Sequence, residues 1–245
     1  DPYEYQKRFH DAKDEQGRLA RQRLLMAANK TGKTYCGACE MAYHLTGDYP
    51  SWWNGYRFRG PIMGWAAGNT SVNSRDIVQA ELLGEPGDDD EFGKGALPKD
   101  RIVKWERQPG IPNAISTVAV KHRSGRNSKL FFKSYEQGKQ AWMGKAIDVI
   151  WMDEEPPQDI YSQALRASLK SGGLTYMTFT PESGMTNVVA QFMNDIRPHQ
   201  QLFNATWDDA PHLDPAIREE ILAALPPHER DMRSKGIPVL GSGLV

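Results

Sequence analysis

The sequence predicts an α/β fold in which helices flank a mainly parallel sheet. Short apolar runs alternate along the chain with longer stretches of helical character, an order typical of parallel sheets. A turn of small residues around Gly32 separates the first apolar run from the first helical stretch. A pair of acids, Asp153 and Glu154, directly follows a later apolar run, "AIDVIWM". These three observations carry the fold prediction.

Composition narrows the class of protein. A chain of 245 residues can form one large domain or two smaller ones. Its 30 basic and 31 acidic residues give a formal net charge of -1, so any nucleic-acid site must be a local patch. The hydrophobic content of 39% is that of a folded chain. No apolar run is long enough to span a bilayer and no signal segment opens the chain, so the cytoplasm is the expected compartment.

The first part of the chain is expected to contain two strand–helix pairs. The strands cover 22–28 and 61–66, and the helices cover 33–46 and 70–84. Asn69 or Thr70 can cap the second helix. The Gly- and Pro-rich loop that follows carries an acidic run, residues 88–91, which we interpret as solvated surface rather than as a metal cluster.

The second part continues the alternation. Two strands joined by the turn "RSGRNS" predict a hairpin, and three further strands alternate with two helices. The expected strands are 114–122, 129–134, 146–152, 174–180 and 200–206, and the helices are 158–170 and 187–195.

The chain changes character after Trp207 and becomes mainly helical. Asp214 and Pro215 suit the cap and first turn of one helix, and a second helix is expected near Pro227. We therefore expect a core at 1–206 and a small subdomain at 207–245.

The turn after the first strand matches a phosphate-binding pattern, G-x-x-x-x-G-K-[ST], except that Ala27 replaces the first glycine. In such a loop, backbone N–H groups and the positive end of the following helix face the phosphates. Lys33 is expected to reach the β- and γ-phosphates, and the Thr34 hydroxyl to complete a Mg²⁺ shell. The candidate nucleotide-binding residues in the loop are Ala27, Ala28, Asn29, Lys30, Thr31, Gly32, Lys33 and Thr34.

A second motif, "VIWMDEEPP", supports the same site. Asp153 ends an apolar strand, where a carboxylate can hold Mg²⁺ through water opposite Thr34. Glu154 follows and could polarise the attacking water as a general base. Consecutive acids after a strand can also cap the next helix, a role that suits Glu155. The two motifs together predict a site for nucleotide phosphates, with Mg²⁺.

Threonines and an N-terminal glutamine add candidate residues. The strand after the acids ends in "TFTP", where Thr178 or Thr180 could bond to the hydrolytic water or to Glu154, although Thr also favours strands. No N-K-x-D motif is present, which disfavours guanine. Gln6 could contact an adenine edge or simply belong to an amphipathic helix. Tyr3, Tyr5 or Phe9 could stack on the adenine, but an amphipathic helix whose aromatics pack into the core explains these residues better.

The cysteines form one C-x-x-C pair, Cys36 and Cys39, within the first predicted helix. Zinc needs about four ligands, and no second pair follows at a suitable spacing. We expect both residues to pack the helix onto the sheet.

Taken together, these segments resemble the ATPase domain of large terminase subunits, the motors that package DNA into the heads of tailed bacteriophages. "AANKTGKT" is similar to that family's variant phosphate loop, and "VIWMDEEPP" to its acidic motif. "FFKSYEQGKQAWMG" resembles the stretch before that motif, and "TFTP" resembles the coupling motif after it. "TWDDAPHL" and "GIPVLGSGLV" are similar to the family's second subdomain and the approach to its nuclease domain.

The resemblance implies a RecA-like, additional-strand ATPase core with a small helical lid. It implies ATP and Mg²⁺ as ligands, and a ring on the portal protein that moves double-stranded DNA into a procapsid. The isolated chain could still be a monomer. The implied partners include the small terminase subunit, and the implied location is the cytoplasm of the infected host, without membrane contact. Because the chain starts at Asp1 and stops at Val245, we expect a fragment that hydrolyses ATP but does not cut DNA.

Some terminases carry an arginine in the phosphate loop, where this chain has Asn29 or Lys30. Lys30 supplies a charge without the planar fork of arginine. A neighbouring subunit could therefore supply the arginine, and the candidates are Arg101, Arg123 and Arg126.

Two other functions stay open, a helicase-like remodeller and a nucleotide-gated docking module without turnover. An intact Glu154 disfavours the docking module.

Overall fold

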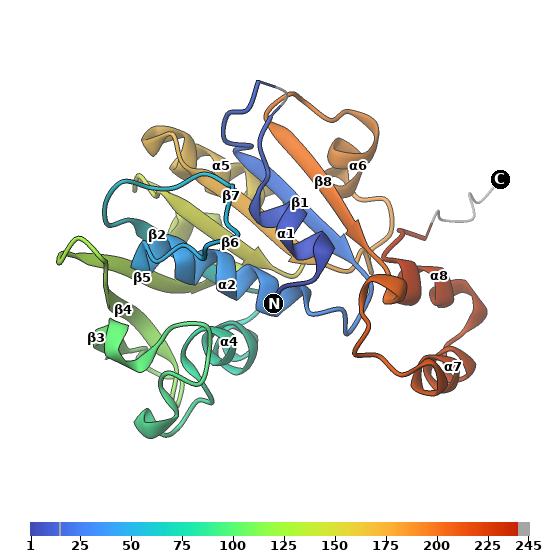
Figure 1. The fold of residues 1–245 in the computed structure, drawn as a ribbon, viewed down its shortest axis with the longest axis horizontal. Helices are drawn as coiled ribbons and strands as arrows, with labels where there is room; N and C mark the ends of the chain where they lie inside the picture. Colours follow the sequence, from blue (N-terminus) through green and yellow to red (C-terminus); the bar gives the residue numbers. More distant parts are fainter. Residues whose placement is uncertain (15, 240–245) are drawn as a thin grey trace.

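A computed structural model describes residues 1–14 and 16–239 of the chain. Its strands form one sheet in the order β3-β4-β5-β2-β6-β7-β1-β8 (Figure 1). The strands are β1 Gln22–Ala27, β2 Met63–Gly68, β3 Ile102–Arg107, β4 Ile115–Lys121, β5 Asn127–Ser134, β6 Val149–Asp153, β7 Leu174–Phe179 and β8 Gln200–Ala205.

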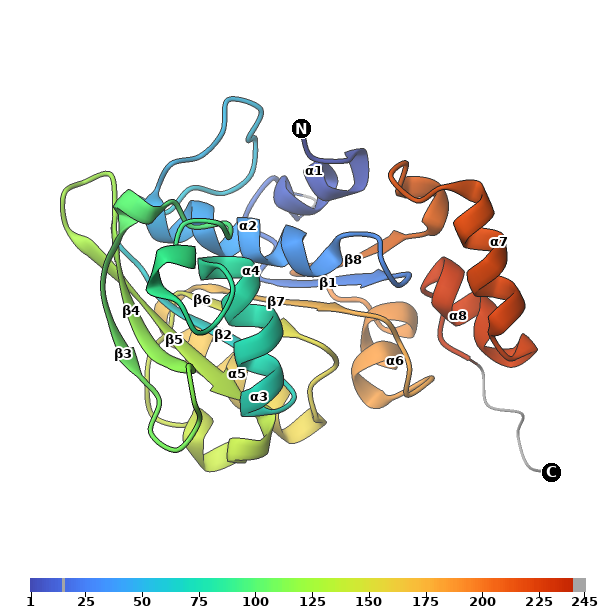
Figure 2. The ribbon, with the colours of Figure 1, turned by 90° about the horizontal axis from the view of Figure 1, so that it is seen from below.

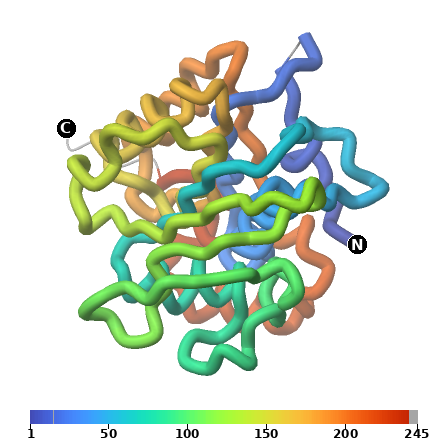
Figure 3. The backbone as a smooth tube through the Cα atoms, turned by 90° about the vertical axis from the view of Figure 1, so that its left-hand side faces the viewer, coloured from blue at the N-terminus to red at the C-terminus, as the bar shows by residue number. Residues whose placement is uncertain are grey.

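The prediction of a mainly parallel sheet is confirmed. From β5 to β8 all neighbouring strands are parallel, whereas β3, β4 and β5 pair antiparallel and include the predicted hairpin. Figure 3 shows this antiparallel edge as green tubes that run side by side. Strand β7 lies between β1 and β6, so one additional strand separates the strand of the phosphate loop from that of the acidic motif.

Strand β3 is absent from the sequence-based prediction. It lies at the edge of the sheet, and its residues Lys104 and Glu106 are exposed. Edge strands tolerate charged side chains, so the segment has no apolar run for the pattern to detect. The other predicted strands are present, with β2 and β6 beginning two and three residues later than expected, at Met63 and Val149.

The predicted helices are present, with one irregularity. The helix expected over 70–84 consists of α3, a π-helical segment at Ser74–Gln79, and α4. Thr70 caps it, because its side chain accepts a hydrogen bond from the Asn73 N–H at 3.0 Å. The α-helices are α1 Glu4–His10, α2 Lys33–Thr46, α3 Ser71–Asn73, α4 Ala80–Leu83, α5 Gln158–Ser171, α6 Asn187–Asn194, α7 Pro215–Ala224 and α8 Arg230–Lys235.

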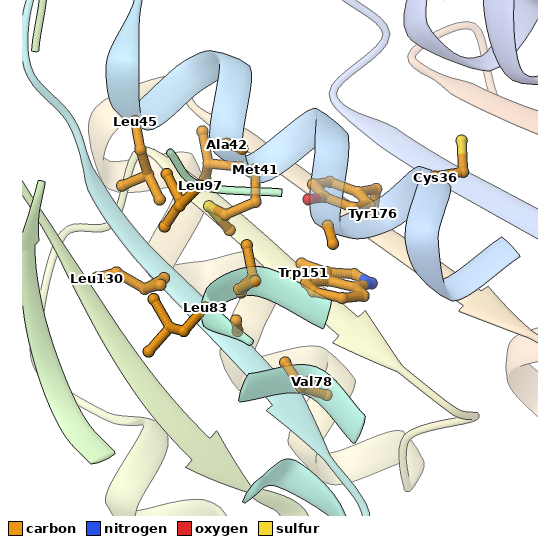
Figure 4. Packing of buried hydrophobic residues seen from close by; sticks show 14 of the residues in the cluster. Cys36, Met41, Ala42, Leu45, Val78, Leu83, Leu97, Leu130, Trp151 and Tyr176 are labelled. Carbon is orange, nitrogen blue, oxygen red and sulfur yellow. The ribbon is translucent and has the colours of Figure 1, made fainter. Parts of the chain in front are cut away.

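Two apolar clusters fix the layers of the domain. One lies between the sheet and α1, α2 and α4, and the other between the sheet and α5 and α6 (Figure 2). Every residue of β1, β6 and β7 is buried, as expected for central parallel strands covered on both faces. Cys36 belongs to the first cluster, but it faces α1 rather than the sheet: its Sγ lies 3.6 Å from His10 Nε2 (Figure 4). Cys39 is half-buried and lines a cavity beside α1, so the expectation that both cysteines pack the helix onto the sheet is wrong; both thiols are free.

Helices α7 and α8 lie at one end of the molecule, beside β1 and β8 (Figure 2). Asp214 caps α7 with Pro215 in its first turn, and a 3₁₀ turn at Pro227–Glu229 precedes α8. A separate apolar cluster, which includes Trp207 and Leu213, joins this part to Ala28. The division at 206/207 stays a prediction, and residues 240–245 of the predicted subdomain lie outside the described residues.

The loop with the acidic run 88–91 is largely exposed, and Asp89 forms an ion pair with Arg107 at 2.8 Å. Within residues 1–14 and 16–239, no group of three or more His, Cys, Asp or Glu side chains is arranged to hold a metal ion. None of the helices described is both long and apolar enough to cross a membrane.

A buried ionic cluster ties α1, α2 and β1 together. The Glu40 carboxylate accepts hydrogen bonds from Arg23 Nη1 at 2.8 Å and lies 2.6 Å from His10 Nδ1 and 2.9 Å from His44 Nε2. Burial alone would raise the pKa of Glu40, but the Arg23 charge and the histidine contacts outweigh burial and hold the pKa well below its ordinary value. The phosphate loop lies between β1 and α2, so this cluster holds both of its flanking elements.

We expect Glu40→Gln to lower the free energy of unfolding by about 3–5 kcal/mol, because it leaves the buried Arg23 charge uncompensated. Since the folded-state pKa lies below the ordinary value of 4.5, the Glu40 contribution is present above that pH and is lost as the pH falls further. Urea unfolding at pH 7 and pH 3 measures both effects, and the wild type and Glu40→Gln should differ less at pH 3. Glu219→Gln, at an exposed position of α7, is the matched control; equal stability of the two variants at pH 7 would contradict the expectation.

Candidate functional site

The turn between β1 and α2 has the backbone of a phosphate loop. Gly32 is the N-cap residue of α2 and has φ +89°, a left-handed conformation that glycine adopts without strain. Lys30 is also left-handed, with φ +60°. Ala27 is fully buried at the end of β1 and has no positive φ, so its ordinary backbone tolerates a side chain where the pattern has glycine.

Helix α1 supports one side of this turn. The Tyr5 hydroxyl donates to the Thr31 carbonyl at 2.6 Å, and Gln6 Nε2 donates to the Gly32 carbonyl at 3.3 Å. The Thr31 hydroxyl donates to the Ala28 carbonyl at 2.9 Å. The expectation that Tyr5 and Phe9 pack into the core is confirmed, and Gln6 lies beside the loop, in the lining of a cavity of about 550 Å³.

The C-terminal part of the chain supports the other side. The Asn29 N–H donates to the Arg233 carbonyl at 3.0 Å, and Trp207 Nε1 donates to the Asn29 carbonyl at 2.8 Å. His212 Nε2 lies 2.9 Å from the Lys30 carbonyl, and the His212 ring stacks on Tyr3. The loop is therefore held by residues from both ends of the described chain.

Asp153 ends β6 and is buried. Its carboxylate accepts a hydrogen bond from the Thr178 hydroxyl at 2.7 Å. Burial, together with the nearby Glu154 charge, raises the pKa of Asp153 to about 7, while the Thr178 and Thr34 hydroxyls and the Lys33 charge act in the opposite direction. The acidic motif and the phosphate loop therefore meet at this carboxylate.

Glu154 follows in a left-handed conformation, with φ +68°, which is uncommon for a residue with a side chain. Its N–H donates to the Thr178 carbonyl at 3.0 Å, and the Tyr135 hydroxyl lies 2.9 Å from the carbonyls of both Asp153 and Glu154. Burial raises the pKa of Glu154, and the positive charge of Lys33 opposes the shift. The Glu154 carboxyl therefore interacts electrostatically with Lys33 of the loop.

Glu155 does not cap the helix that follows it. The N-cap residue of α5 is Pro157, which makes no side-chain cap bond. The Glu155 carboxylate instead accepts a hydrogen bond from the hydroxyl of Thr186, the N-cap residue of α6. This contact joins the acidic motif to the segment after β7.

Thr178 and Thr180 lie near different motifs. Thr178 bonds to Asp153, whereas the Thr180 hydroxyl lies 2.7 Å from both the Ala27 carbonyl and Asn29 Oδ1. The hydroxyl has one proton, so it donates to one of these oxygens at a time. The end of β7 therefore contacts the acidic motif and the phosphate loop together.

A buried aromatic support beneath the site was missed by sequence reasoning. Trp151 Nε1 donates to the Thr178 hydroxyl at 2.8 Å, and its ring stacks on Tyr176, whose hydroxyl donates to the Gly37 carbonyl at 2.7 Å (Figure 4). A Cβ atom at Gly37 would lie 2.5 Å from Trp151 Nε1. The available signal in the sequence was Gly37, a glycine inside a predicted helix, together with the large Trp151 side chain in a predicted strand.

The three arginines proposed to act on a neighbouring subunit lie away from the phosphate loop of their own chain. Arg101 pairs with Asp48 at 2.6 Å, just beyond the C-terminal end of α2, and the Arg123 N–H donates to the Thr46 carbonyl at that same end. Arg126 shares the β4–β5 turn with Arg123. The phosphate loop is at the opposite, N-terminal end of α2.

The sheet order and these contacts define an α/β domain with a phosphate loop and an additional strand. The chain belongs to the large terminase subunit family: residues 24–245 match the family model described as "Terminase large subunit, T4likevirus-type, N-terminal". It is 37% identical to the large terminase subunit of Salmonella phage P22 over 261 residues, which cover all of this chain and 52% of that protein. With the large terminase subunit of Enterobacteria phage LP7 it shares 29% identity, over 73% of this chain and 38% of that protein. The chain therefore spans about half, or less, of the length of these relatives.

Solved structures agree on the fold. The large terminase ATPase domain of Thermus phage P74-26 superposes with a TM-score of 0.67 at 16% identity, covering 98% of this chain and 94% of that chain. The large terminase of a second thermophilic bacteriophage, in complex with ATP-gamma-S, gives a TM-score of 0.65 at 12% identity, covering 94% of this chain and 51% of that chain. The predicted RecA-like P-loop fold is confirmed.

We expect Gly37→Ala to lower the free energy of unfolding by about 1–3 kcal/mol, because the added Cβ overlaps Trp151. This sign is opposite to the ordinary helix effect, since alanine normally stabilises a helix relative to glycine by roughly 0.5–1 kcal/mol. Urea unfolding measures the change. If Trp151 is the cause, adding Trp151→Phe costs less in the Gly37→Ala background than in the wild type, and strictly additive losses would contradict the explanation.

Proposed function

We propose that this chain is the ATP-hydrolysing motor domain of a phage DNA-packaging terminase. The observation that carries the proposal is that the end of β7 joins the two motifs. Thr178 bonds to Asp153 of the acidic motif, and the Thr180 hydroxyl lies 2.7 Å from Ala27 and Asn29 of the phosphate loop. A structurally similar terminase from a thermophilic bacteriophage was solved with ATP-gamma-S, which supports ATP as the nucleotide.

Each residue of the proposed site has a separate task. Backbone N–H groups of the loop, including that of Gly32, and the start of α2 bind phosphate oxygens. Lys33 neutralises the β- and γ-phosphates, and Glu154 accepts a proton from the attacking water. The raised pKa of Glu154 suits a base that must take up a proton.

The donor set fits Mg²⁺, because a carboxylate and a hydroxyl, from Asp153 and Thr34, are the hard oxygen ligands that this ion binds while keeping several waters. Mg²⁺ held by these residues would neutralise negative charge on the phosphates. The Thr178 hydroxyl orients the Asp153 carboxylate, and Thr180 connects the loop to the segment after β7. These two threonines are proposed to report the state of the nucleotide.

The cavity beside the loop suits the adenosine part of the nucleotide. Its lining includes Gln6, Gly32, Tyr35 and Cys36. Gln6 Nε2 donates a hydrogen bond to the Gly32 carbonyl, and Gln6 Oε1 accepts one from the Tyr3 N–H, so the side chain is held in the cavity lining. We propose that Gln6 contacts adenine, although its present bonds equally fit a residue that braces the loop.

The remaining parts of the proposal concern the assembled motor. We propose a core at 1–206 and a lid at 207–245, a ring of copies on the portal protein, and translocation of double-stranded DNA with the small terminase subunit as a partner. The proposed location is the cytoplasm of the infected host. A nucleotide-gated docking module without turnover is the competing function. Arg101, Arg123 or Arg126 would serve only a neighbouring copy, because each lies far from the loop of its own chain.

We expect Glu154→Gln to retain ATP binding within about twofold and to reduce phosphate release by roughly 10²–10⁴-fold, because the variant keeps the shape and loses the base. Fluorescence titration and a steady-state phosphate assay measure the two quantities. Glu219→Gln is the exposed control. Absence of turnover in the wild type, both isolated and assembled, would favour the docking module.

Lys33→Ala is expected to weaken triphosphate binding by about 10–100-fold, because it removes a charge-assisted hydrogen bond to phosphate. Titration with ATP and Mg²⁺ gives the dissociation constants, with Lys170→Ala, exposed at the end of α5, as the control. Unchanged affinity in Lys33→Ala would remove the loop from the site.

A further inference from the structure

Helix α8 brings an arginine to the edge of the phosphate loop. The Arg233 carbonyl accepts the Asn29 N–H at 3.0 Å, and Asn204 Nδ2 donates to the carbonyls of Met26 and Lys235 at 3.0 and 3.1 Å. A Cβ atom at Gly236 would lie 2.7 Å from the Ala27 carbonyl carbon, so the end of α8 is in close contact with the end of β1. The position of the Arg233 backbone is thus fixed relative to the loop.

The guanidinium of Arg233 is only partly engaged. Nη1 bonds to the carboxylate of Glu182, and Nε is 3.5 Å from Glu229 Oε2. Nε is buried and has no hydrogen-bond partner among the described residues. The Glu182 side chain is 49% exposed, and pairs in contact with solvent are weak. Arg233 can therefore leave Glu182 for a stronger anion.

The surroundings of Arg233 indicate which anion that is. Arg233 contacts the loop through the Asn29 N–H and contacts the segment after β7 through Glu182. The Glu154 N–H donates to the Thr178 carbonyl at 3.0 Å, at the end of the same β7 strand, so the acidic motif adjoins that segment. Glu182 lies two residues after Thr180, which contacts the loop. The region between Lys33 and Glu154 is where the terminal phosphate lies in the proposed function.

We propose that Arg233 is an arginine supplied in cis, which exchanges Glu182 for the terminal phosphate of the bound nucleotide. The inference rests on the proposed function. A guanidinium fork matches phosphate oxygens in geometry, and a terminal phosphate carries more charge than one carboxylate. The loop itself has Asn29 and Lys30 and lacks an arginine, so α8 supplies the missing fork.

The exchange has a structural consequence. Releasing Glu182 removes the ion pair between α8 and the segment after β7, while Thr180 still connects that segment to the loop. Loss of the terminal phosphate returns Arg233 to Glu182. The partner of Arg233 therefore depends on whether a triphosphate or a diphosphate is bound, and this change of partner alters the contact between α8 and the segment after β7.

The test is a comparison of affinities for ATP-gamma-S and ADP, both with Mg²⁺, by fluorescence titration of the 245-residue chain. We expect Arg233→Ala to weaken ATP-gamma-S binding by about tenfold or more and ADP binding by less than about twofold, because only the triphosphate has the group that Arg233 contacts. ATP turnover should fall by at least about 10²-fold. Arg230→Ala, exposed on the same helix, should change neither affinity.

Glu182→Gln is expected to change the affinity for ATP-gamma-S in the opposite direction, and it leaves Arg233 in place. It removes the competing carboxylate, so ATP-gamma-S should bind a few-fold more tightly while ADP binding stays unchanged. The gain should vanish in the Glu182→Gln/Arg233→Ala double variant. If Arg233→Ala does not fold, which thermal melting shows, Glu182→Gln and Arg233→Lys decide the question, since lysine keeps the charge and loses the fork.

Two results would overturn the inference while leaving the proposed function intact. Equal losses for ATP-gamma-S and ADP in Arg233→Ala would mean that the residue only supports the loop. Unchanged affinities and turnover would mean that the arginine comes from another subunit. If the wild type binds neither nucleotide, the proposed function fails and the inference fails with it.

Discussion

Strand β7 is the constraint on which the arrangement of the site depends. Because it lies between β1 and β6, its C-terminal end is adjacent to the ends of both motif-bearing strands. Thr178 bonds to Asp153 on one side, and Thr180 reaches Ala27 and Asn29 on the other. A shift of β7 therefore changes the distance between the acidic motif and the phosphate loop.

The loop is held in its strained shape by contacts from distant parts of the chain. Lys30 has a left-handed backbone, a conformation that costs free energy unless its surroundings determine it. Tyr5 from α1 and Trp207 from the C-terminal part each donate a hydrogen bond to a loop carbonyl. These bonds fix the turn before a ligand arrives, which lowers the entropy that binding must overcome.

Local patterns predicted the fold and named the candidate residues of the site, because strands, turns and motifs each consist of consecutive residues. Gly32 and Asp153 could be found this way, since Gly32 lies in the turn after the apolar strand β1 and Asp153 is the last residue of the apolar strand β6. Contacts between distant segments leave no such pattern. The overlap that Gly37 avoids with Trp151 depends on how α2 packs on β6, and Arg233 reaches the loop from a distant part of the sequence. A surface arginine in a short helix has no local feature that distinguishes it from its neighbours.

Asn29 shows how the loop could transmit its state in two directions. Its N–H bonds to the Arg233 carbonyl, and its side-chain oxygen lies 2.7 Å from the Thr180 hydroxyl. Any displacement of this one residue therefore acts on both α8 and the segment after β7. Since packed elements change position in discrete steps rather than continuously, a small movement at the loop can be converted into a larger movement of α8. Asn29 thus provides a mechanical route between the loop and α8, and the proposed exchange of Arg233 provides an electrostatic one; both connect the same two elements.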